Sequence, residues 1–434
     1  GGQDPGGTVE TMSEQRTIYV HGNGFHLDDA LCVVLLRHLP EFKDAKLVRV
    51  YREDKILEEV MEKAVQNGDI VCDIGRVYDH SKRLYDHHQQ DYTERYEGSR
   101  VTHCAAGLLY RHYGRQVLRA IIEATPTHPT PTADNPNPSP YPPVNLTDEE
   151  LENLYHRVYK GFVEEVDGVD NGYGAAGLED NPRKQGDVTN YSQGGTSLGS
   201  RIHHGNGIKW NDPIYKEEYL HPEATMELIR AKEDAAFNKA VDMVRPEFEA
   251  KVRGTYFGPM RIAAYIAKHY EARHSIHPSG RIMVLDEPVP RGMVNGEILS
   301  YEEKKGLDPM GPDAPCFCLF PKTWNPTEPN HRVLALKRVR TSFENRVGLY
   351  NPCRGKSAED IEAELGFPGI TFVHNSGFLG QGNTLEAGLR LCMVSLGLTD
   401  SAPLMQWLET YEAGRVERER ERDAAGVAAA TSSE

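Results

Sequence analysis

The sequence has no long apolar run, no excess of positive charge and few cysteines. Its most apolar stretch, residues 30–36, ends at Arg37 and is far shorter than the roughly 18 residues that a membrane span needs. We therefore expect no membrane protein. Lysine and arginine total 49 against 65 aspartates and glutamates, for a net charge of −16. No general positive field attracts nucleic acid, so an anionic substrate has to be recognised locally, by metals or by a basic pocket.

The seven cysteines are odd in number and scattered along 434 residues. This pattern favours a reducing, intracellular compartment over a disulfide framework. The length suits two or three domains of roughly 150 residues each. Hydrophobic residues make up 38% of the chain, which is too many for a wholly disordered protein.

Three segments have compositions that disfavour a packed core. Residues 1–16 are rich in glycine and polar residues, and we expect a disordered segment that includes an expression remnant. Residues 125–145 consist mostly of Pro, Thr, Asn and Ser and predict a surface insertion. Residues 413–434 predict a charged, fraying tail.

An α/β pattern begins at Thr17. Short apolar segments at 17–21, 46–52 and 69–75 predict buried strands, and residues 28–40 predict a helix between the first two. This alternation indicates parallel βαβ units, in which ligands bind beyond the carboxyl ends of the strands. His21 ends the first predicted strand and Asp73 ends the third.

The rest of the chain predicts helices at 146–172 and at about 214–275, followed by a second α/β region. Its predicted strands lie at 281–287, 316–320, 333–339 and 369–374. We therefore expect an α/β protein with two domains. The first covers 17–275 and contains the proline-rich insertion, and a smaller one covers 276–412.

Metal-ligating side chains gather in four clusters of the first domain. The first cluster holds two histidines and two aspartates, the second is an aspartate at a strand end, the third is an Asp-His-His triplet, and the fourth is an acidic helix end: His21, His26, Asp28 and Asp29; Asp73; Asp86, His87 and His88; Glu164, Glu165, Asp167 and Asp170. Mixed imidazole and carboxylate groups without cysteine suit Mn²⁺, Mg²⁺ or catalytic Zn²⁺. Each cluster alone is more simply a surface histidine pair, a turn residue or a solvated helix face. Their order and their placement at strand ends favour a metal centre.

The amino-acid sequences of these clusters resemble those of a known family. The triplet at residues 86–88, after a histidine-rich turn and a strand-terminal aspartate, is similar to the DHH phosphoesterase superfamily. The segments HGNGFHLDDALC, YDHHQ, EEVDGVDNG and FVHNSGFLG resemble its melanocyte-proliferating-gene branch of metal-dependent hydrolases, over residues 17–395 without the insertion. The resemblance implies a DHH-type parallel-sheet catalytic domain and a smaller substrate-binding domain.

The resemblance also implies roles for individual residues. Two divalent ions, Mn²⁺ before Mg²⁺ or Zn²⁺, would be held by His21, His26, Asp28, Asp73, His87 and one further carboxylate. Asp73 would bridge both ions. The further carboxylate is Asp167 or Asp170, with Asp167 preferred. Asp29 is the residue of the first cluster that the resemblance supports least. Catalysis is expected to involve His88, Asp28 and Asp73. His88 would face the scissile phosphate or support the metal ligands from behind, and it is a candidate proton donor.

Substrate recognition is expected from the second domain. The glycine-rich segment around residues 374–380 is predicted to form a turn between a strand and a helix, where backbone N–H groups favour phosphate. The alternative to phosphate binding is that this segment forms a tight turn that is needed only for folding. The candidate residues for binding substrate are His374, Ser376, Gly377 and Gly380, with Arg201, Arg346 and Arg354 as phosphate clamps.

These features predict a two-metal phosphodiesterase, with a 3′–5′ exonuclease of RNA or short oligonucleotides as the leading hypothesis. One alternative is a pyrophosphatase-like hydrolase of small phosphoanhydrides or nucleotides. Another is a non-catalytic RNA-processing adaptor with structural metals. The resemblance implies a nuclear or mitochondrial location, with the cytoplasm also open, and the oligomeric state is left open.

Overall fold

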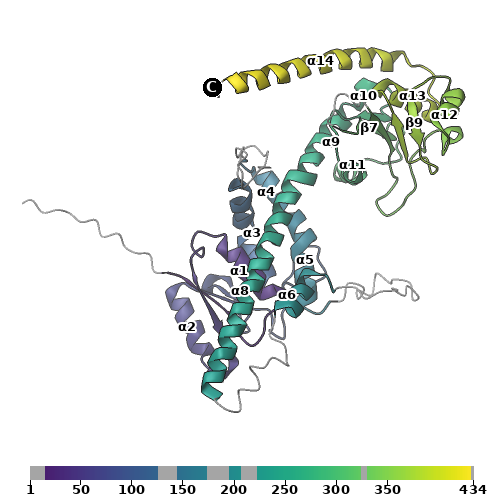
Figure 1. Ribbon diagram of the computed structural model, residues 1–434. Coiled ribbons are helices and arrows are strands. Elements are labelled where there is room, and N and C mark those ends of the chain that lie inside the picture. The colour runs from purple at the N-terminus through teal and green to yellow at the C-terminus, as the bar shows by residue number, and fades with distance from the viewer. Residues whose placement is uncertain (1–14, 126–143, 174–194, 207–221, 324–329, 432–434) are drawn as a thin grey trace, which may run out of the picture. The chain divides into compact units, whose positions relative to one another are not determined.

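A computed structural model describes residues 15–125, 144–173, 195–206, 222–323 and 330–431. It confirms the α/β class and divides the chain into two compact units, Gly1–Phe257 and Gly258–Glu434 (Figure 1). Most of segment 1–16 and of the predicted insertion at 125–145 lies outside the described residues. Among the helices that are described, none has a stretch apolar and long enough to cross a bilayer.

The first unit is built on a mainly parallel five-stranded sheet of order β2-β1-β3-β5-β4. Three neighbouring pairs run parallel, and only β4 is antiparallel to β5. The strands are β1 (Thr17–His21), β2 (Lys46–Val50), β3 (Ile70–Cys72), β4 (Tyr78–Asp79) and β5 (Leu84–Tyr85). The carboxyl ends of β1, β2, β3 and β5 therefore meet at one edge of the sheet.

Side chains alternate between the two faces of this sheet. Tyr19 and Val71 point to the face covered by α2 (Leu57–Asn67), where Val60 and Met61 pack on them. Helix α1 (Leu27–Arg37) is buried along most of its length and packs against α3 (Ala105–Glu123) and α8 (Pro222–Thr255). Figure 1 shows α2 and α1 on opposite sides of the strands.

A helical layer completes the first unit. Helix α4 (Asp148–Val158) starts at the Thr147 cap, whose hydroxyl accepts a hydrogen bond from Glu150 N. It continues through a π-helical turn, Tyr159–Val163, into α5 (Glu164–Asp170). Helix α6 (Leu198–Asn206) packs on α8. Short 3₁₀ turns cover Arg52–Asp54 and His80–Lys82.

The second unit contains a mixed sheet of order β6-β7-β8-β10-β9. Its strands are β6 (Ile282–Val284), β7 (Phe317–Pro321), β8 (His331–Ala335), β9 (Ile370–Val373) and β10 (Leu379–Gly382). β6 and β7 are parallel and the other pairs are antiparallel. Strand β10 was not predicted, because its sequence LGQG lacks the β-branched and aromatic residues that mark strands.

Helices cover both faces of this second sheet. Two of them, α9 (Arg261–Glu271) and α11 (Arg291–Lys305), contribute to one core, and α13 (Leu385–Leu396) and α14 (Ala402–Thr431) contribute to the other. Shorter pieces are α10 (Arg273–Ile276), α12 (Ala358–Leu365), the π-helical turn Tyr256–Met260 and the 3₁₀ turn Asn351–Cys353. The residues of the expected tail are helical as far as Thr431. Because α9 packs on the second sheet, the division falls before the expected boundary at residue 275.

Candidate metal centre

Six histidine and aspartate side chains converge at the carboxyl edge of the first sheet. His21 ends β1, Asp73 follows β3, and the triplet that includes His87 follows β5. Helix α1 adds Asp28 and Asp29 from its first turn, and α5 adds Asp170 from its last position. These residues form two groups whose ligand atoms lie within 4.8 Å of one another, one of His21, Asp29 and Asp73, and one of Asp28, His87 and Asp170.

Asp73 connects the two groups through its two carboxylate oxygens. Asp73 Oδ2 lies 3.1 Å from His21 Nε2, and Asp73 Oδ1 lies 3.2 Å from His87 Nε2. The Asp73 backbone has φ +59°, in the left-handed region that aspartate tolerates better than most residues. One carboxylate therefore faces both histidines, as a ligand shared by two cations would.

Hydrogen bonds fix which nitrogen each histidine directs at the carboxylates. His21 Nδ1 lies 2.9 Å from the carbonyl oxygen of Gly22, and His87 Nδ1 lies 2.8 Å from Asn171 Oδ1. Each Nδ1–H donates to that oxygen, so each Nε2 is left to face the centre. This arrangement is the one that orients metal-binding histidines in proteins.

Backbone N–H groups hold the two aspartates of α1. Asp28 accepts hydrogen bonds from Ala105 N and Ala106 N at the start of α3, and Asp29 Oδ1 accepts from His26 N and Ala30 N. Both carboxylates are fully buried. Their positions are therefore set by the fold.

The charge of the cluster is unbalanced without cations. Burial raises the pKa of Asp28 well above its ordinary value, and the nearby carboxylates of Asp73 and Asp170 raise it further. Burial lowers the pKa of His21 and His87, but the adjacent carboxylates outweigh burial and raise both to about 11. The cluster thus favours positive charge at both Nε2 positions, and divalent cations can take the place of these protons.

The donor set fits hard or borderline divalent cations. Asp29 Oδ2 lies 3.0 Å from His21 Nε2 without hydrogen-bond alignment, so this buried oxygen accepts no hydrogen bond among the described residues. A buried carboxylate oxygen without an aligned hydrogen-bond donor, beside imidazole nitrogens and further carboxylates, is a natural metal ligand. His21, Asp29 and Asp73 could hold one cation, and Asp28, Asp73, His87 and Asp170 a second.

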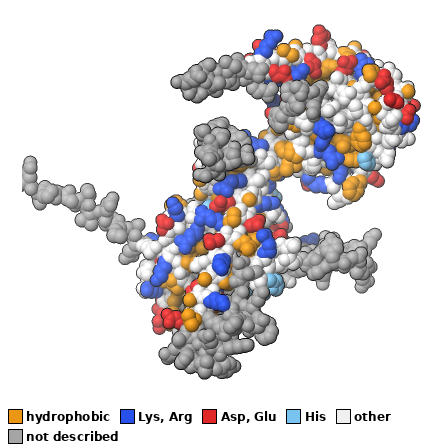
Figure 2. Space-filling model, viewed as in Figure 1, with side chains coloured by type: hydrophobic (Ala, Val, Ile, Leu, Met, Phe, Trp, Pro, Cys, Tyr) orange, Lys and Arg blue, Asp and Glu red, His pale blue; other side chains and the backbone are white. Residues whose placement is uncertain are grey.

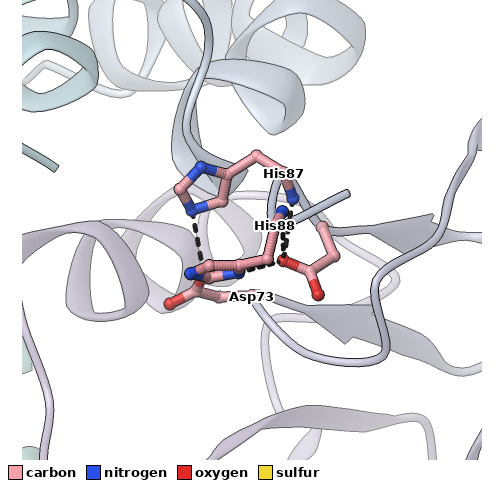
Figure 3. A group of neighbouring side chains, drawn as sticks. Asp73, His87 and His88 are labelled. Atoms are coloured by element: carbon pink, nitrogen blue, oxygen red, sulfur yellow. Dashed lines mark hydrogen bonds and ion pairs between the residues drawn. The ribbon is translucent and has the colours of Figure 1, made fainter. Parts of the chain in front are cut away.

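The Asp86–His87–His88 turn forms a third group together with Asp73, and its ligand atoms also lie within 4.8 Å of one another. Figure 3 shows His87 and His88 next to the Asp73 carboxylate. Asp86 Oδ1 lies 2.6 Å from His88 Nδ1 and also accepts from His87 N. The hydrogen bond to Asp86 raises the pKa of His88 above its ordinary value.

A cavity of about 760 Å³ opens onto the centre and exposes part of it to solvent. Its wall includes His21, Asp73, His88 and Asp170, together with the cationic side chains of Arg52, Lys55 and Arg76. The sequence analysis missed these three cations, because single exposed Arg and Lys residues have no distinguishing local signal.

Two of the predicted metal ligands lie outside these groups, although His26 lines the same cavity as His21. His26 is exposed at the start of α1, where its ring stacks on His203 at 5.9 Å, and it belongs to none of the ligand groups. Asp167 is fully buried and accepts hydrogen bonds from His103 Nδ1, Cys104 N and the Tyr159 hydroxyl. Of the two aspartates left open by the sequence, Asp170 is the one that reaches His87, with Asp170 Oδ2 3.1 Å from His87 Nε2.

Two of the predicted arginine clamps are engaged in other contacts. Arg346 is buried in the second unit and forms a bidentate pair with Glu302, at 2.7 and 2.5 Å. Arg201 on α6 is exposed and pairs with Glu247 at 3.1 Å, and it does not line the cavity. The Arg346 guanidinium is therefore enclosed by protein, whereas that of Arg201 stays accessible to solvent.

The remaining predicted binding residues gather at one hairpin of the second unit. His374 Nδ1 lies 2.9 Å from Ser376 Oγ, Gly377 has φ +70°, and Arg354 lies beneath that glycine and donates to Leu349 O. Gly380 pairs with Val373 across β10 and β9. The turn joins these two strands and not a strand and a helix, so the expected helix start is absent from the turn itself.

Comparisons with known proteins agree along nearly the whole chain. A sequence model of the MYG1 family, described as "Uncharacterised protein family (UPF0160)", matches residues 17–396. The MYG1 protein of Saccharomyces cerevisiae is 30% identical over 389 residues, which are 89% of this chain and 96% of that protein. The MYG1 protein of Dictyostelium discoideum is 28% identical, over 88% and 96%. The MYG1 exonuclease of Homo sapiens is 29% identical, over 89% and 87%.

One solved structure, of an uncharacterized protein from Helicobacter pylori, is 12% identical over 85% of this chain and 92% of its own. Its TM-score of 0.20 is too low to carry an argument about the fold.

Proposed function

This chain belongs to the MYG1 family, and we propose that it is a metal-dependent phosphodiesterase that removes nucleotides from RNA or short oligonucleotides, in the 3′–5′ direction. Relatives in Homo sapiens and Bos taurus are named MYG1 exonuclease, which supports a nuclease-type activity. The DHH-type character of the catalytic domain is part of the proposal.

One observation carries the proposal. The two oxygens of Asp73 face separate groups, His21 with Asp29 on one side and His87 on the other. Divalent cations in such paired sites supply an activated water nucleophile and neutralise the charge that develops on a phosphate. We propose two ions, Mn²⁺ before Mg²⁺ or Zn²⁺.

His88 is the proposed proton donor to the leaving oxygen. Its Nδ1 is hydrogen-bonded to Asp86, and its side chain is half-exposed on the cavity wall. The Asp86 carboxylate fixes the orientation of the ring and favours its protonated form, while Nε2 remains available to a ligand in the cavity. Asp28 and Asp73 are the other proposed catalytic residues, and both carboxylates are buried.

The hairpin at residues 374–377 is the proposed recognition element of the second unit. His374 and Ser376 offer a nitrogen and a hydroxyl on an exposed turn, and Arg354 adds a guanidinium beneath it. These groups suit a phosphate or a nucleotide. The nuclear, mitochondrial or cytoplasmic location stays a proposal of the family resemblance.

The test combines activity with metal content. Purified protein stripped with EDTA is resupplied with Mn²⁺, Mg²⁺ or Zn²⁺ and given RNA, single-stranded DNA, dinucleotide and pyrophosphate. We expect 5′-labelled RNA to form a descending ladder and 3′-labelled RNA to release a mononucleotide at once. Asp73→Asn should lose the activity and both ions by elemental analysis, whereas the exposed control Asp44→Asn should keep both.

Three outcomes would overturn parts of this proposal. Hydrolysis of pyrophosphate alone would favour the phosphoanhydride alternative. Bound metal without hydrolysis of any substrate would favour a non-catalytic adaptor. Full retention of two ions by Asp73→Asn would refute its bridging position.

A further inference from the structure

The cavity beside the metal centre has a rim of three cations that the proposed chemistry does not use. We propose that Arg52, Lys55 and Arg76, here called the cationic rim, bind the backbone phosphates that flank the scissile phosphate of a single-stranded nucleic acid. This inference rests on the proposed function and adds a phosphate-binding site to it.

The sheet topology places the residues of the cationic rim on both sides of β1, the strand that carries His21. Arg52 and Lys55 lie in the 3₁₀ turn and the residue after it, beyond the carboxyl end of β2, while Arg76 follows Asp73 at the end of β3. Strand β1, which carries His21, lies between β2 and β3. All three cations line the same cavity as His21 and Asp73. A single-stranded nucleic acid that lies along this edge of the sheet would contact these cations next to the metal ligands.

The local backbone fixes this arrangement. Asn23 Oδ1 accepts a hydrogen bond from Arg52 N, which ties the turn after β2 to the turn after β1. Asp86 Oδ2 accepts from Arg76 N, which ties the turn after β3 to the Asp-His-His triplet. Two of the three cationic residues are thus joined through their backbones to turns of the metal centre.

The side chains of the cationic rim are free of ion pairs. None of the three makes a side-chain hydrogen bond or an ion pair within 4 Å to another residue in the described ranges. The neighbouring acids are already occupied, because Glu53 accepts from Asn23 and lies near Arg230, and Asp54 pairs with Arg230 at 2.8 Å. Glu53 and Asp54 therefore do not neutralise Arg52 and Lys55, whose positive charges remain available to solvent and to the cavity.

Charge and size together favour a nucleic-acid strand over a small anion. The protein has a net charge of −16, and Figure 2 shows acidic and basic side chains interspersed on the visible face of the first unit. Against this background, three unpaired cations in one cavity form a local site of the kind that anion recognition requires. A substrate with one phosphate would engage the metal centre alone, whereas a longer strand offers phosphates to the rim.

The test measures how binding depends on salt. Anisotropy of a labelled single-stranded RNA 12-mer is followed with the full chain in EDTA, where hydrolysis stops, at several salt concentrations. Each of Arg52→Gln, Lys55→Gln and Arg76→Gln should weaken binding about ten-fold. Each should also reduce the slope of log Kd against log salt by about 0.7, so the triple variant loses about 2.

Matched variants separate this effect from general charge. Arg52→Lys and Arg76→Lys keep the charge and should keep the wild-type slope, and Lys63→Gln, exposed on α2 outside the cavity, should not change it. A triple variant with the wild-type slope, or an equal loss in Lys63→Gln, would overturn the cationic rim. A wild-type chain that binds RNA through the rim but cleaves none with any metal would refute only the proposed function.

Discussion

At the residue scale, the candidate centre depends on which carboxylate of α5 faces the histidines. Asp167 and Asp170 lie three positions apart on one short helix, so they project from similar sides of it, about one turn apart along its axis. Asp170 reaches His87, while Asp167 is enclosed by α3, where a Cβ at Gly107 would overlap its carboxylate. The two aspartates therefore have different roles despite their similar sequence context.

Exchanging each carboxylate for an amide should separate these roles. Asp170→Asn should weaken metal binding by at least about ten- to a hundred-fold and leave the free energy of unfolding nearly unchanged. Asp167→Asn should lower that free energy by about 1–3 kcal/mol, because three buried donors lose a charged acceptor, yet keep both metals in the folded protein. Metal titration by calorimetry and urea unfolding measure the two effects. The opposite pattern would restore Asp167 as the ligand.

At the scale of elements, the stability of the second unit depends on an ion pair between α11 and the segment after β8. Glu302 of α11 accepts two hydrogen bonds from Arg346 and one from the Tyr270 hydroxyl, at 2.9 Å. Arg346 also donates to Pro315 O and Lys337 O. This arginine therefore joins α11, the segment before β7 and the segment after β8.

Removing Arg346 alone should destabilise the second unit. Arg346→Met leaves Glu302 buried without its partner and should cost about 3–5 kcal/mol in the free energy of unfolding, measured in urea. The double variant with Glu302→Leu should recover much of that loss, because neither charge is then buried alone. Arg338→Met, at an exposed position, is the control. A higher KM with unchanged stability would instead return Arg346 to substrate binding.

At the scale of the whole molecule, the candidate metal centre lies within one unit and the second unit has its own cores. A ligand that binds only the folded first unit stabilises that unit by mass action. Four carboxylates converge on the centre, so cations also relieve repulsion there. The two units should therefore respond differently to added metal.

Scanning calorimetry of the full chain tests this expectation. With Mn²⁺ at about 100 times its Kd, the transition of the first unit should gain about 2.7 kcal/mol, or about 5–10 °C in Tm. The transition of the second unit should stay in place, and Asp73→Asn should abolish the shift. An equal rise of both transitions, or a rise that persists in Asp73→Asn, would contradict a centre confined to the first unit.

The sequence by itself determined the features that depend on neighbouring residues. Short apolar segments and their alternation with helices identified the strands β1 and β3, at whose carboxyl ends His21 and Asp73 lie, and the class is confirmed as α/β. Because parallel strands end at the same edge, the pattern also predicted that the turns after β1 and β3 lie together, whereas the two-residue strand β5 was not predicted. The family resemblance added the expectation of a shared carboxylate, which stays a proposal.

Tertiary structure alone decided which side chains face the centre and which face the core. Sequence spacing could not choose between Asp167 and Asp170, since the choice depends on how α5 packs against α3. It could not show that Arg346 meets Glu302, 44 residues away, or that Arg52 and Arg76 share a cavity. Such contacts join residues distant in the chain, and their energies depend on burial and on partners that no local pattern contains.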